Sequence, residues 1–222
     1  MKFKTYINQL IKEYRHIFTP EKMRSFYTAL FLLALGMIFQ YYSSNYSIAH
    51  SQQFVGDIFL DNLPTINLNI IVVEGALLCL FCSFIFVLLN PKYLIFTIKT
   101  VAVFIALRAF FVAITHLGLY PNQIVPSKGF FDRLYLSLNL QSGYFFSAHV
   151  GMPFLVALIF WKEKLARTIF LTLSFIFGVS VLLAHIHYSI DVFAAPFMTY
   201  SIFKMSEYLF KEDYNINIID TK

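Results

Sequence analysis

Long apolar runs constrain the fold of this chain more than any other feature of its sequence. Six such runs alternate with polar or charged segments, and their approximate limits are 26–42, 68–89, 93–117, 144–161, 168–183 and 188–203. Several approach the roughly 20 apolar residues that an α-helix needs to cross a bilayer. Hydrophobic residues make up 59% of the chain, and the mean hydropathy is +0.68, which exceeds what a soluble core requires. We therefore predict an all-α, polytopic membrane protein with six transmembrane helices.

The first 25 residues have a different pattern. Apolar side chains recur at helical spacing between Phe3 and Phe18, and basic residues stand between them. This pattern predicts an amphipathic N-terminal helix at the membrane interface, although packing against the protein's own cytosolic loops is an equally good interpretation. The expected organisation is an interfacial segment (1–25), a six-helix transmembrane domain (26–205) and a polar cytosolic tail (206–222).

Basic residues indicate how the helices are oriented. They gather in the N-terminal segment, near Lys92, in the turn 162–167 and in the tail, whereas the loop 43–67 has none and the loop 118–142 has only Lys128 and Arg133. The positive-inside rule then places both termini in the cytosol and these two loops at the outer face, which is periplasmic, exoplasmic or lumenal. The net charge of +5 is spread over short segments, so we expect no nucleic-acid partner. The oligomeric state stays open.

Ionisable residues gather where the last predicted helix begins, in the stretch AHIHYSIDVF (184–193). Such residues are costly in a membrane segment and by default indicate function. His187 and Asp191 are four residues apart, a spacing that puts both side chains on one face of a helix. A carboxylate beside an imidazole fixes its tautomer and raises its basicity, which suits a nucleophile or a general base. An ion pair at a helix end is the alternative interpretation.

A second histidine joins this pair through the predicted topology. His149 stands near the start of the fourth apolar run, so the charge pattern places it at the same outer face as His187. Two imidazoles and a carboxylate can move a phosphoryl group without a metal, because one imidazole attacks phosphorus and the other protonates the leaving alkoxide. We therefore expect catalysis by His149, His187 and Asp191, with no metal and no cofactor.

These stretches resemble those of a known family. Ser147-Ala148-His149 and His187-Tyr188-Ser189-Ile190-Asp191-Val192 are similar to the Ser-Gly-His and His-Tyr-Thr-x-Asp-Val stretches of sphingomyelin synthases, within the superfamily of type 2 phosphatidic acid phosphatases. Leu107-Arg108-Ala109 resembles the family's arginine stretch, and Asp61-Asn62-Leu63-Pro64 resembles its Pro-rich first motif. The resemblance implies a six-helix catalytic domain and a lipid substrate. It also makes His187 the nucleophile that forms a phosphohistidine, Asp191 its orienting partner and His149 the acid/base.

The resemblance further suggests which residues bind the substrate. The expected set is Arg108, Ser147, Tyr144, Tyr188 and His185. Tyr144, Tyr188 and Tyr120 would form an aromatic wall around a quaternary ammonium group, and tyrosines that only pack at the membrane interface are the alternative. Arg108 would either pair with Glu74 or reach the phosphate while Glu74 supports it, and a structural buried pair is at least as good an interpretation for Glu74.

Departures from the family pattern bear on the substrate. Ala148 replaces a glycine, Gly143 stands where the synthases have an acidic residue, and Val181 stands where the phosphatase branch has an arginine. The Lys…Arg-Pro stretch of that branch is also missing. A phosphomonoester is nearly dianionic and needs a stronger cationic clamp than a singly charged phosphodiester. The sequence therefore favours transfer of a head group between lipids over hydrolysis of phosphatidic acid.

We predict a membrane-embedded transferase that moves a phospho-head group, such as phosphocholine, from a glycerophospholipid to ceramide or diacylglycerol. A lipid phosphatase or a phospholipase C-type hydrolase is the alternative. A metalloenzyme that uses His116 and His185 together with the catalytic residues is a weaker hypothesis, because the paired histidines of a di-iron site are missing. A transporter would place ionisable residues along a path through the helices rather than at one face.

Overall fold

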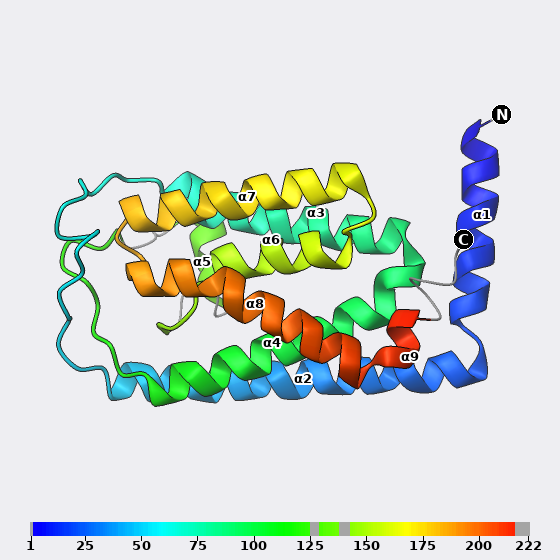
Figure 1. Ribbon diagram of the computed structural model, residues 1–222, viewed down its shortest axis with the longest axis horizontal. Helices are drawn as coiled ribbons and strands as arrows, with labels where there is room; N and C mark the ends of the chain where they lie inside the picture. The colour runs from blue at the N-terminus through cyan, green and yellow to red at the C-terminus, as the bar shows by residue number, and fades with distance from the viewer. Residues whose placement is uncertain (1, 125–128, 138–142, 216–222) are drawn as a thin grey trace.

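The computed structural model describes residues 2–124, 129–137 and 143–215, and this part of the chain is helical without strands (Figure 1). The helices are α1 (Lys2–Ile17), α2 (Pro20–Ala49), η1 (a π-helix, Ile70–Glu74), α3 (Gly75–Leu89), η2 (a 3-10 helix, Pro91–Tyr93), α4 (Leu94–Ile114), α5 (Phe130–Ser137), α6 (Ala148–Ile159), α7 (Lys164–Leu183), α8 (Ser189–Leu209) and α9 (Lys211–Tyr214). Lys128 and the end of the predicted tail, 216–222, lie outside the described residues.

Four helical segments are long and apolar enough to cross a membrane. They are Pro20–Ala49, Ile70–Leu89, Pro91–Ile114 and Lys164–Leu183. Helix α6 is apolar but has only 12 residues, and α8 carries Asp191, Lys204 and Glu207 within its 21 residues. Both nevertheless pack in the bundle, where α6 contacts α7 and α8. The structure therefore supports a helical membrane protein, and the count of six crossings stays a prediction.

Helix α2 continues to Ala49, seven residues beyond the predicted end of the first apolar run. Its small residues explain this length, because they face α4 and let the two helices approach closely. A Cβ added to Gly36 would lie 3.2 Å from the carbonyl oxygen of Ala102. Near the outer end, the buried Ser47 donates a hydrogen bond from Oγ to the carbonyl oxygen of Thr115 at 3.1 Å. The polar residues that predicted a loop at 43 instead form part of a helix–helix contact.

Helix α1 lies crosswise at the end of the bundle that holds both termini (Figure 1). The Tyr14 hydroxyl donates a hydrogen bond to the carbonyl oxygen of Leu88, at the end of α3, over 2.8 Å. This contact agrees with the interpretation that the segment packs against the rest of the protein, here at the turn after α3. Its role at the membrane interface stays a prediction.

The same end is closed by a buried ion pair. Lys99 Nζ on α4 lies 2.5 Å from Asp213 Oδ2 on α9, and the side chains are 9% and 12% exposed. Ser25 on α2 donates to Asp213 at 2.9 Å and accepts from Lys99 at 2.7 Å. The expected tail from 206 onward is thus helical through Tyr214 and bound to the bundle.

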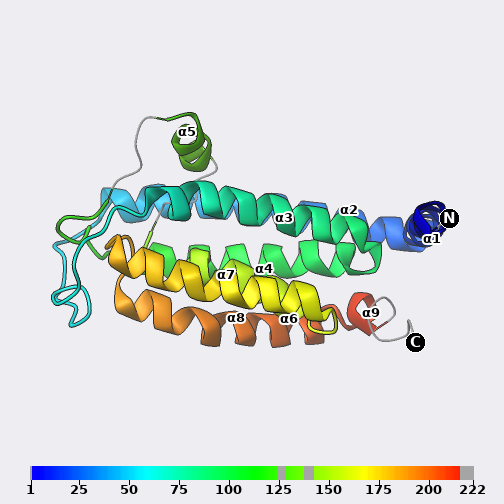
Figure 2. The same cartoon turned by 90° about the horizontal axis from the view of Figure 1, so that it is seen from above.

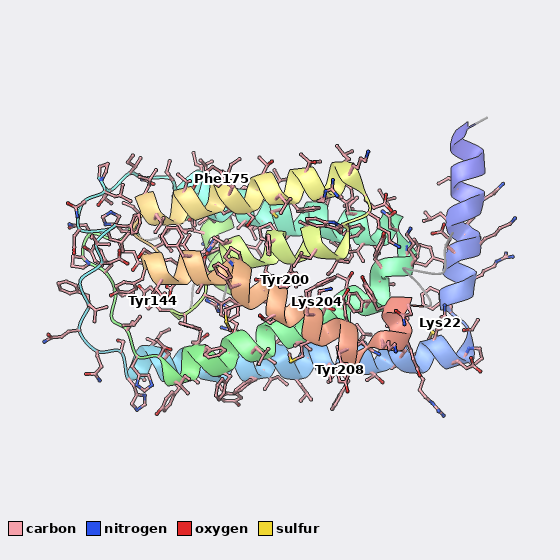
Figure 3. The ribbon with its side chains drawn as sticks, in the orientation of Figure 1. Lys22, Tyr144, Phe175, Tyr200, Lys204 and Tyr208 are labelled. Atoms are coloured by element: carbon pink, nitrogen blue, oxygen red, sulfur yellow. The ribbon has the colours of Figure 1, made fainter. Side chains whose placement is uncertain are left out.

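Loops cover the opposite end of the bundle. The chain between α2 and η1 and the chain after α4 cross this end in both views (Figures 1 and 2). They are attached to the turn between α7 and α8, because Ile66 and Ile124 donate backbone hydrogen bonds to the carbonyl oxygens of Leu183 and Ala184 at 2.7 and 3.1 Å. Tyr144 lies at this end and Lys22 at the other (Figure 3). This loop-covered end contains the predicted outer face.

The Lys99–Asp213 pair gives a stability prediction. Asp213→Asn leaves a buried ammonium group without its charged partner, so it should destabilise the protein by about 3 kcal/mol. Glu207→Gln breaks a pair of equal length, 2.5 Å, whose lysine is 51% exposed, so its cost should stay below about 1 kcal/mol. Thermal unfolding in detergent, followed by fluorescence, compares the two variants. Equal shifts in the unfolding temperature of the two variants would show that burial does not strengthen the Lys99–Asp213 pair.

Candidate active site

His187 and Asp191 are in direct contact. His187 Nδ1 lies 3.1 Å from Asp191 Oδ2, and the two side chains are 6% and 0% exposed. The helical spacing that predicted this contact is not its cause, because α8 begins at Ser189 and His187 precedes the helix. Tyr188 is extended at the helix N-cap, and the chain there turns His187 back over the first turn, which contains Asp191. Donation from Nδ1 to the carboxylate leaves the Nε2 lone pair of His187 available for attack.

Asp191 also holds the segment that leads into α6. Its Oδ1 accepts a hydrogen bond from the Phe145 backbone N–H at 3.1 Å, and its own carbonyl oxygen accepts one from Ser147 N–H at 2.9 Å. Phe145 and Phe146 have φ values of 94° and 30°, which non-glycine residues rarely adopt. Backbone strain of this kind persists where surrounding contacts impose it. Asp191 thereby joins the beginning of α8 to the beginning of α6.

The first turn of α6 presents His149 to His187. Helix α6 begins at Ala148, and the ring centroids of His149 and His187 are 5.8 Å apart. The two histidines therefore lie together at one end of the bundle, as the charge-based topology predicts. Ala148 is the first helical residue of α6, so the family's glycine is not needed for backbone freedom at this position.

Arg108 reaches the same segment from α4. Its side chain is buried, and its Nη2 donates to the carbonyl oxygen of Gly143 at 3.1 Å. Gly143 has φ of 82°, and a Cβ there would lie 2.3 Å from Val112 Cγ1. The acidic residue of the synthases thus has no room at position 143 in this backbone. Glu74 Oε2 is buried without a hydrogen-bond partner among the described residues, and the proposed pair with Arg108 does not form there.

These groups outline a site for an anion. Ser147 is the N-cap of α6, and its fully buried Oγ has no hydrogen-bond partner in the described part of the chain. A helix N-terminus presents unpaired N–H groups and a partial positive charge, which together bind phosphate. The start of α6, Ser147 and Arg108 can therefore bind phosphate oxygens next to both histidines.

The three predicted wall tyrosines lie together beside this site. The Tyr144 ring centroid is 5.2 Å from that of Tyr188 and 6.2 Å from that of His187, and Tyr120 is 5.8 Å from Tyr188. Their rings meet edge to face, and their hydroxyls bind loop groups, among them Tyr188 to the carbonyl oxygen of Gly118 at 2.9 Å. These contacts favour the packing interpretation over an open cage for a quaternary ammonium group.

The other histidines lie beside the centre. His185 has φ of 56°, and its Nδ1 is 3.3 Å from Thr65 Oγ1, so it helps to attach the loop between α2 and η1. His116 packs against the rings of Tyr46 and His50, with centroids 5.5 and 5.8 Å away. In the residues that the structure describes, no group of three or more His, Cys, Asp or Glu is placed to hold a metal ion.

Two residues at the site escaped the sequence analysis. Asp57 is buried in the loop between α2 and η1, and its carboxylate accepts hydrogen bonds from the backbone N–H groups of Ser189, Phe59 and Leu60 at 2.7, 2.9 and 3.2 Å. It caps α8 from a distant segment, a contact that local spacing does not reveal. Tyr135 on α5 is 1% exposed, and its hydroxyl lies 2.8 Å from His149 Nε2. The segment that holds Tyr135 had been expected to be a loop.

An apolar cavity leads away from His149 into the bundle. Its volume is about 430 Å³, which falls in the range of ligand pockets. Residues of α2, α3, α4 and α6 line it, and His149 and Tyr135 also contribute to its wall. Along α3 the lining extends from Ala76 to Val87, about 16 Å at the helical rise of 1.5 Å per residue. This depth equals about half of the ~30 Å hydrocarbon core of a bilayer.

Comparison with known proteins agrees with this geometry. Residues 142–208 match the family model described as PAP2 superfamily C-terminal. The matched segment contains Ser147, His149, His187 and Asp191, whereas Arg108 precedes it. This segment, which is less than half of the chain, is therefore similar to the C-terminal part of PAP2 superfamily proteins. No curated protein and no solved structure gives a significant match.

Asp57 gives a prediction about pH. Burial raises the pKa of its carboxyl, but hydrogen bonds from Ser189, Leu60 and Phe59 offset this and hold the pKa below its ordinary 3.8. A pKa lowered by folding means that the ionised carboxylate stabilises the protein above about pH 4 and that this contribution is lost as the pH falls further. Asp57→Asn should therefore be less stable than the wild type at pH 7, and the difference should shrink toward pH 3.

Thermal unfolding in detergent between pH 7 and pH 3 measures this difference. Glu212→Gln changes an exposed acid at the other end of the bundle and should follow the wild-type profile. A gap between Asp57→Asn and wild type that stays constant down to pH 3 would contradict a role for the ionised carboxylate.

Proposed function

We propose that this protein is an integral-membrane transferase of phospho-head groups that resembles sphingomyelin synthases. The donor is a glycerophospholipid, such as phosphatidylcholine or phosphatidylethanolamine, and the acceptor is a lipid alcohol, ceramide or diacylglycerol. Six transmembrane crossings place the termini in the cytosol and the site at the outer face. The observation that carries the proposal is the position of His149, which stands 5.8 Å from His187 and also lines the apolar cavity.

The first half of the reaction transfers the head group to the protein. His187 Nε2 attacks phosphorus while Asp191 holds the proton on Nδ1, and the phosphorus–oxygen bond to the glycerolipid breaks. The leaving alkoxide takes a proton from His149, which gives diacylglycerol and a phosphohistidine at His187. Each such proton transfer contributes typically 10²–10⁴ in rate.

The second half passes the head group to the acceptor. The hydroxyl of the lipid alcohol gives its proton to His149, its oxygen attacks phosphorus, and the phosphorus–nitrogen bond to His187 breaks. His149 regains the proton that it lost in the first half, so the cycle needs no outside acid or base. The anion site formed by Ser147, Arg108 and the start of α6 binds the phosphate oxygens in both halves.

The charge of the site favours a phosphodiester. Arg108 is the cation that the structure brings to the segment before α6, and one guanidinium matches a single negative charge. Val181, where the phosphatase branch has an arginine, is fully buried in the apolar core. A phosphomonoester would bring a second negative charge into a site shielded from water.

Hydrolysis is the second candidate, because water and a lipid alcohol can give their proton to His149 in the same way. The two functions are separated by a product assay. The purified protein is incubated in mixed micelles with phosphatidylcholine and labelled ceramide or diacylglycerol, and the lipids are identified by mass spectrometry. Transfer predicts a labelled acceptor that carries the head group. Free phosphocholine without any labelled product would contradict the transferase.

The histidine roles predict how three variants differ. His187→Ala should abolish turnover, because it removes the nucleophile, and His149→Ala should lower the rate by about 10²–10⁴. His116→Ala changes a histidine that packs on Tyr46 and His50 and should stay near the wild-type rate. The measurement is head-group transfer by protein that elutes as the wild type does in size-exclusion chromatography. Near wild-type turnover by His187→Ala would exclude the phosphohistidine.

Substrate charge gives a further prediction. The protein should consume phosphatidylcholine or phosphatidylethanolamine at least tenfold faster than phosphatidic acid, because one guanidinium leaves the second monoester charge uncompensated. Arg108→Lys should lose most of the activity, since an ammonium group cannot replace a bidentate fork. Assays with each lipid alone, side by side, make the comparison. Phosphate release from phosphatidic acid as the fastest reaction would place the chain with the phosphatases instead.

A further inference from the structure

The Tyr135 hydroxyl contacts Nε2 of His149, the nitrogen that exchanges protons in the proposed reaction. Its hydroxyl lies 2.8 Å from His149 Nε2, and both side chains are buried, at 1% and 7% exposure. Burial raises the pKa of the Tyr135 phenol, and the nearby charge of Arg108 opposes this only in part, so the hydroxyl keeps its proton. It donates a hydrogen bond to Nε2 in the His149 tautomer whose Nε2 is unprotonated. His149 is then neutral and carries its own proton on Nδ1.

In the proposed cycle, His149 is neutral between the first and the second half of the reaction. After His149 has protonated the leaving alkoxide, it is neutral and must wait for the hydroxyl of the acceptor. During that interval the phosphohistidine is exposed to hydrolysis, because a water molecule that reached Nε2 would be activated in the same way. A hydroxyl already bound at Nε2 leaves no acceptor position for water on that atom.

Helix α5 brings Tyr135 to this position from outside the bundle. In Figure 2, α5 lies beyond α2 and α3 rather than between the helices. Asp132, one turn before Tyr135, accepts a hydrogen bond from Asn69 Nδ2 at 2.9 Å, next to η1. Phe130 and Phe131 on the same helix are 68% and 50% exposed, so α5 presents its apolar residues outward and Tyr135 inward. This attachment fixes the phenol against His149.

The phenol also stands beside the apolar cavity, since Tyr135 and His149 both line it. If one hydrocarbon chain of a lipid filled the cavity, its polar end would lie near Tyr135 and His149, next to His149 Nε2. The phenol hydroxyl and a lipid hydroxyl offer the same O–H donor to that nitrogen. The two groups therefore compete for one position.

We propose that Tyr135 favours the lipid acceptor over water in the reaction at His149. In the phosphohistidine state the Tyr135 hydroxyl is bound to His149 Nε2, and the hydroxyl of the lipid acceptor displaces it. Water is thereby disfavoured as the attacking group. This inference rests on the proposed function. In transfer, the lipid oxygen bonds to phosphorus, its proton moves to Nε2 and the bond to His187 breaks. In hydrolysis, the oxygen of water bonds to phosphorus, its proton moves to Nε2 and the bond to His187 breaks, which releases the free phospho-head group. Tyr135 thus acts through His149 as a positioning residue that decides the ratio of the two products.

Tyr135→Phe tests the proposal because it removes only the hydroxyl. The ratio of free phosphocholine to transferred head group should rise about fivefold or more, in line with the loss of one buried hydrogen bond. The matched control is Tyr93→Phe, which removes another buried phenol hydroxyl, 3.3 Å from Glu163 near the cytosolic turn. Its product ratio should equal that of the wild type. A ratio unchanged in Tyr135→Phe, even with a lower total rate, would reduce Tyr135 to a packing residue and overturn the proposal.

A second measurement does not depend on turnover. Diethyl pyrocarbonate acylates neutral imidazole nitrogens that are free to react, and peptide mass spectrometry reports each histidine separately. In a His187→Ala background, acylation of His149 relative to His116 should be several-fold faster with Tyr135→Phe than without it, and Tyr93→Phe should have no effect. Equal acylation with and without the Tyr135 hydroxyl would show that the phenol does not occupy Nε2, which overturns the proposal.

The two measurements also separate this inference from the proposed function. A wild-type protein that only hydrolyses its substrate would contradict the transferase. In that protein the role assigned to Tyr135 still requires faster hydrolysis and faster His149 acylation in Tyr135→Phe. Unchanged rates in both assays would reject the role of Tyr135 independently of the reaction type.

Discussion

The carboxylate of Asp191 is the interaction on which the rest of the site depends. It is fully buried, it orients His187 through Oδ2 at 3.1 Å, and it binds the Phe145 N–H through Oδ1 at 3.1 Å. A buried carboxylate is tolerated only when its oxygens are satisfied, so these contacts stabilise one another. The chain before α6 accepts unusual backbone angles to complete them, and the same bend brings His149 and Ser147 to the site. One charge thus assembles groups from α6 and α8.

Each end of the bundle contains a buried network of hydrogen bonds and charged groups. At the end with the termini, Lys99, Asp213 and Ser25 form a compact buried network that ties α9 to α4 and α2. At the loop-covered end, the network around Asp191 includes groups that await a ligand, such as Ser147 Oγ, which has no partner among the described residues. Because this hydroxyl lies at the N-terminus of α6, next to His149, it can donate a hydrogen bond to a phosphate oxygen there.

Between these ends the bundle contains an apolar cavity that meets the polar site at His149. This arrangement suits an amphiphilic substrate, because a charged head and a hydrocarbon chain need opposite surroundings. The contact between Tyr135 and His149 lies at the boundary between the two environments. In the proposed reaction, selection between water and a lipid alcohol takes place where the polar and apolar parts of the site join.

The sequence by itself predicted a helical membrane protein and the residues of the candidate site, because both predictions depend on local information. Run length and mean hydropathy predict membrane helices, and the spacing of charged residues predicts which ends of the helices lie together. His149, His187 and Asp191 were identified in this way, although His187 proved to precede α8 rather than to lie on its face. The extension of α2 through Ser47 was missed, since a serine reads as polar until its partner on α4 is known.

Only the tertiary structure decided the contacts between segments that are distant in the chain. Asp57 caps α8 across 132 residues, and Tyr135 meets His149 from a segment that the sequence predicted as a loop. The cavity likewise exists only where six helices, α2 to α7, leave a space between them that their side chains do not fill. A short local pattern in the sequence does not predict the Asp57 cap, the contact between Tyr135 and His149 or the cavity. Each of these features depends on two or more separate elements that meet in space. The sequence thus determined which ionisable residues are available for a site, and the packing of the helices decided which groups surround them.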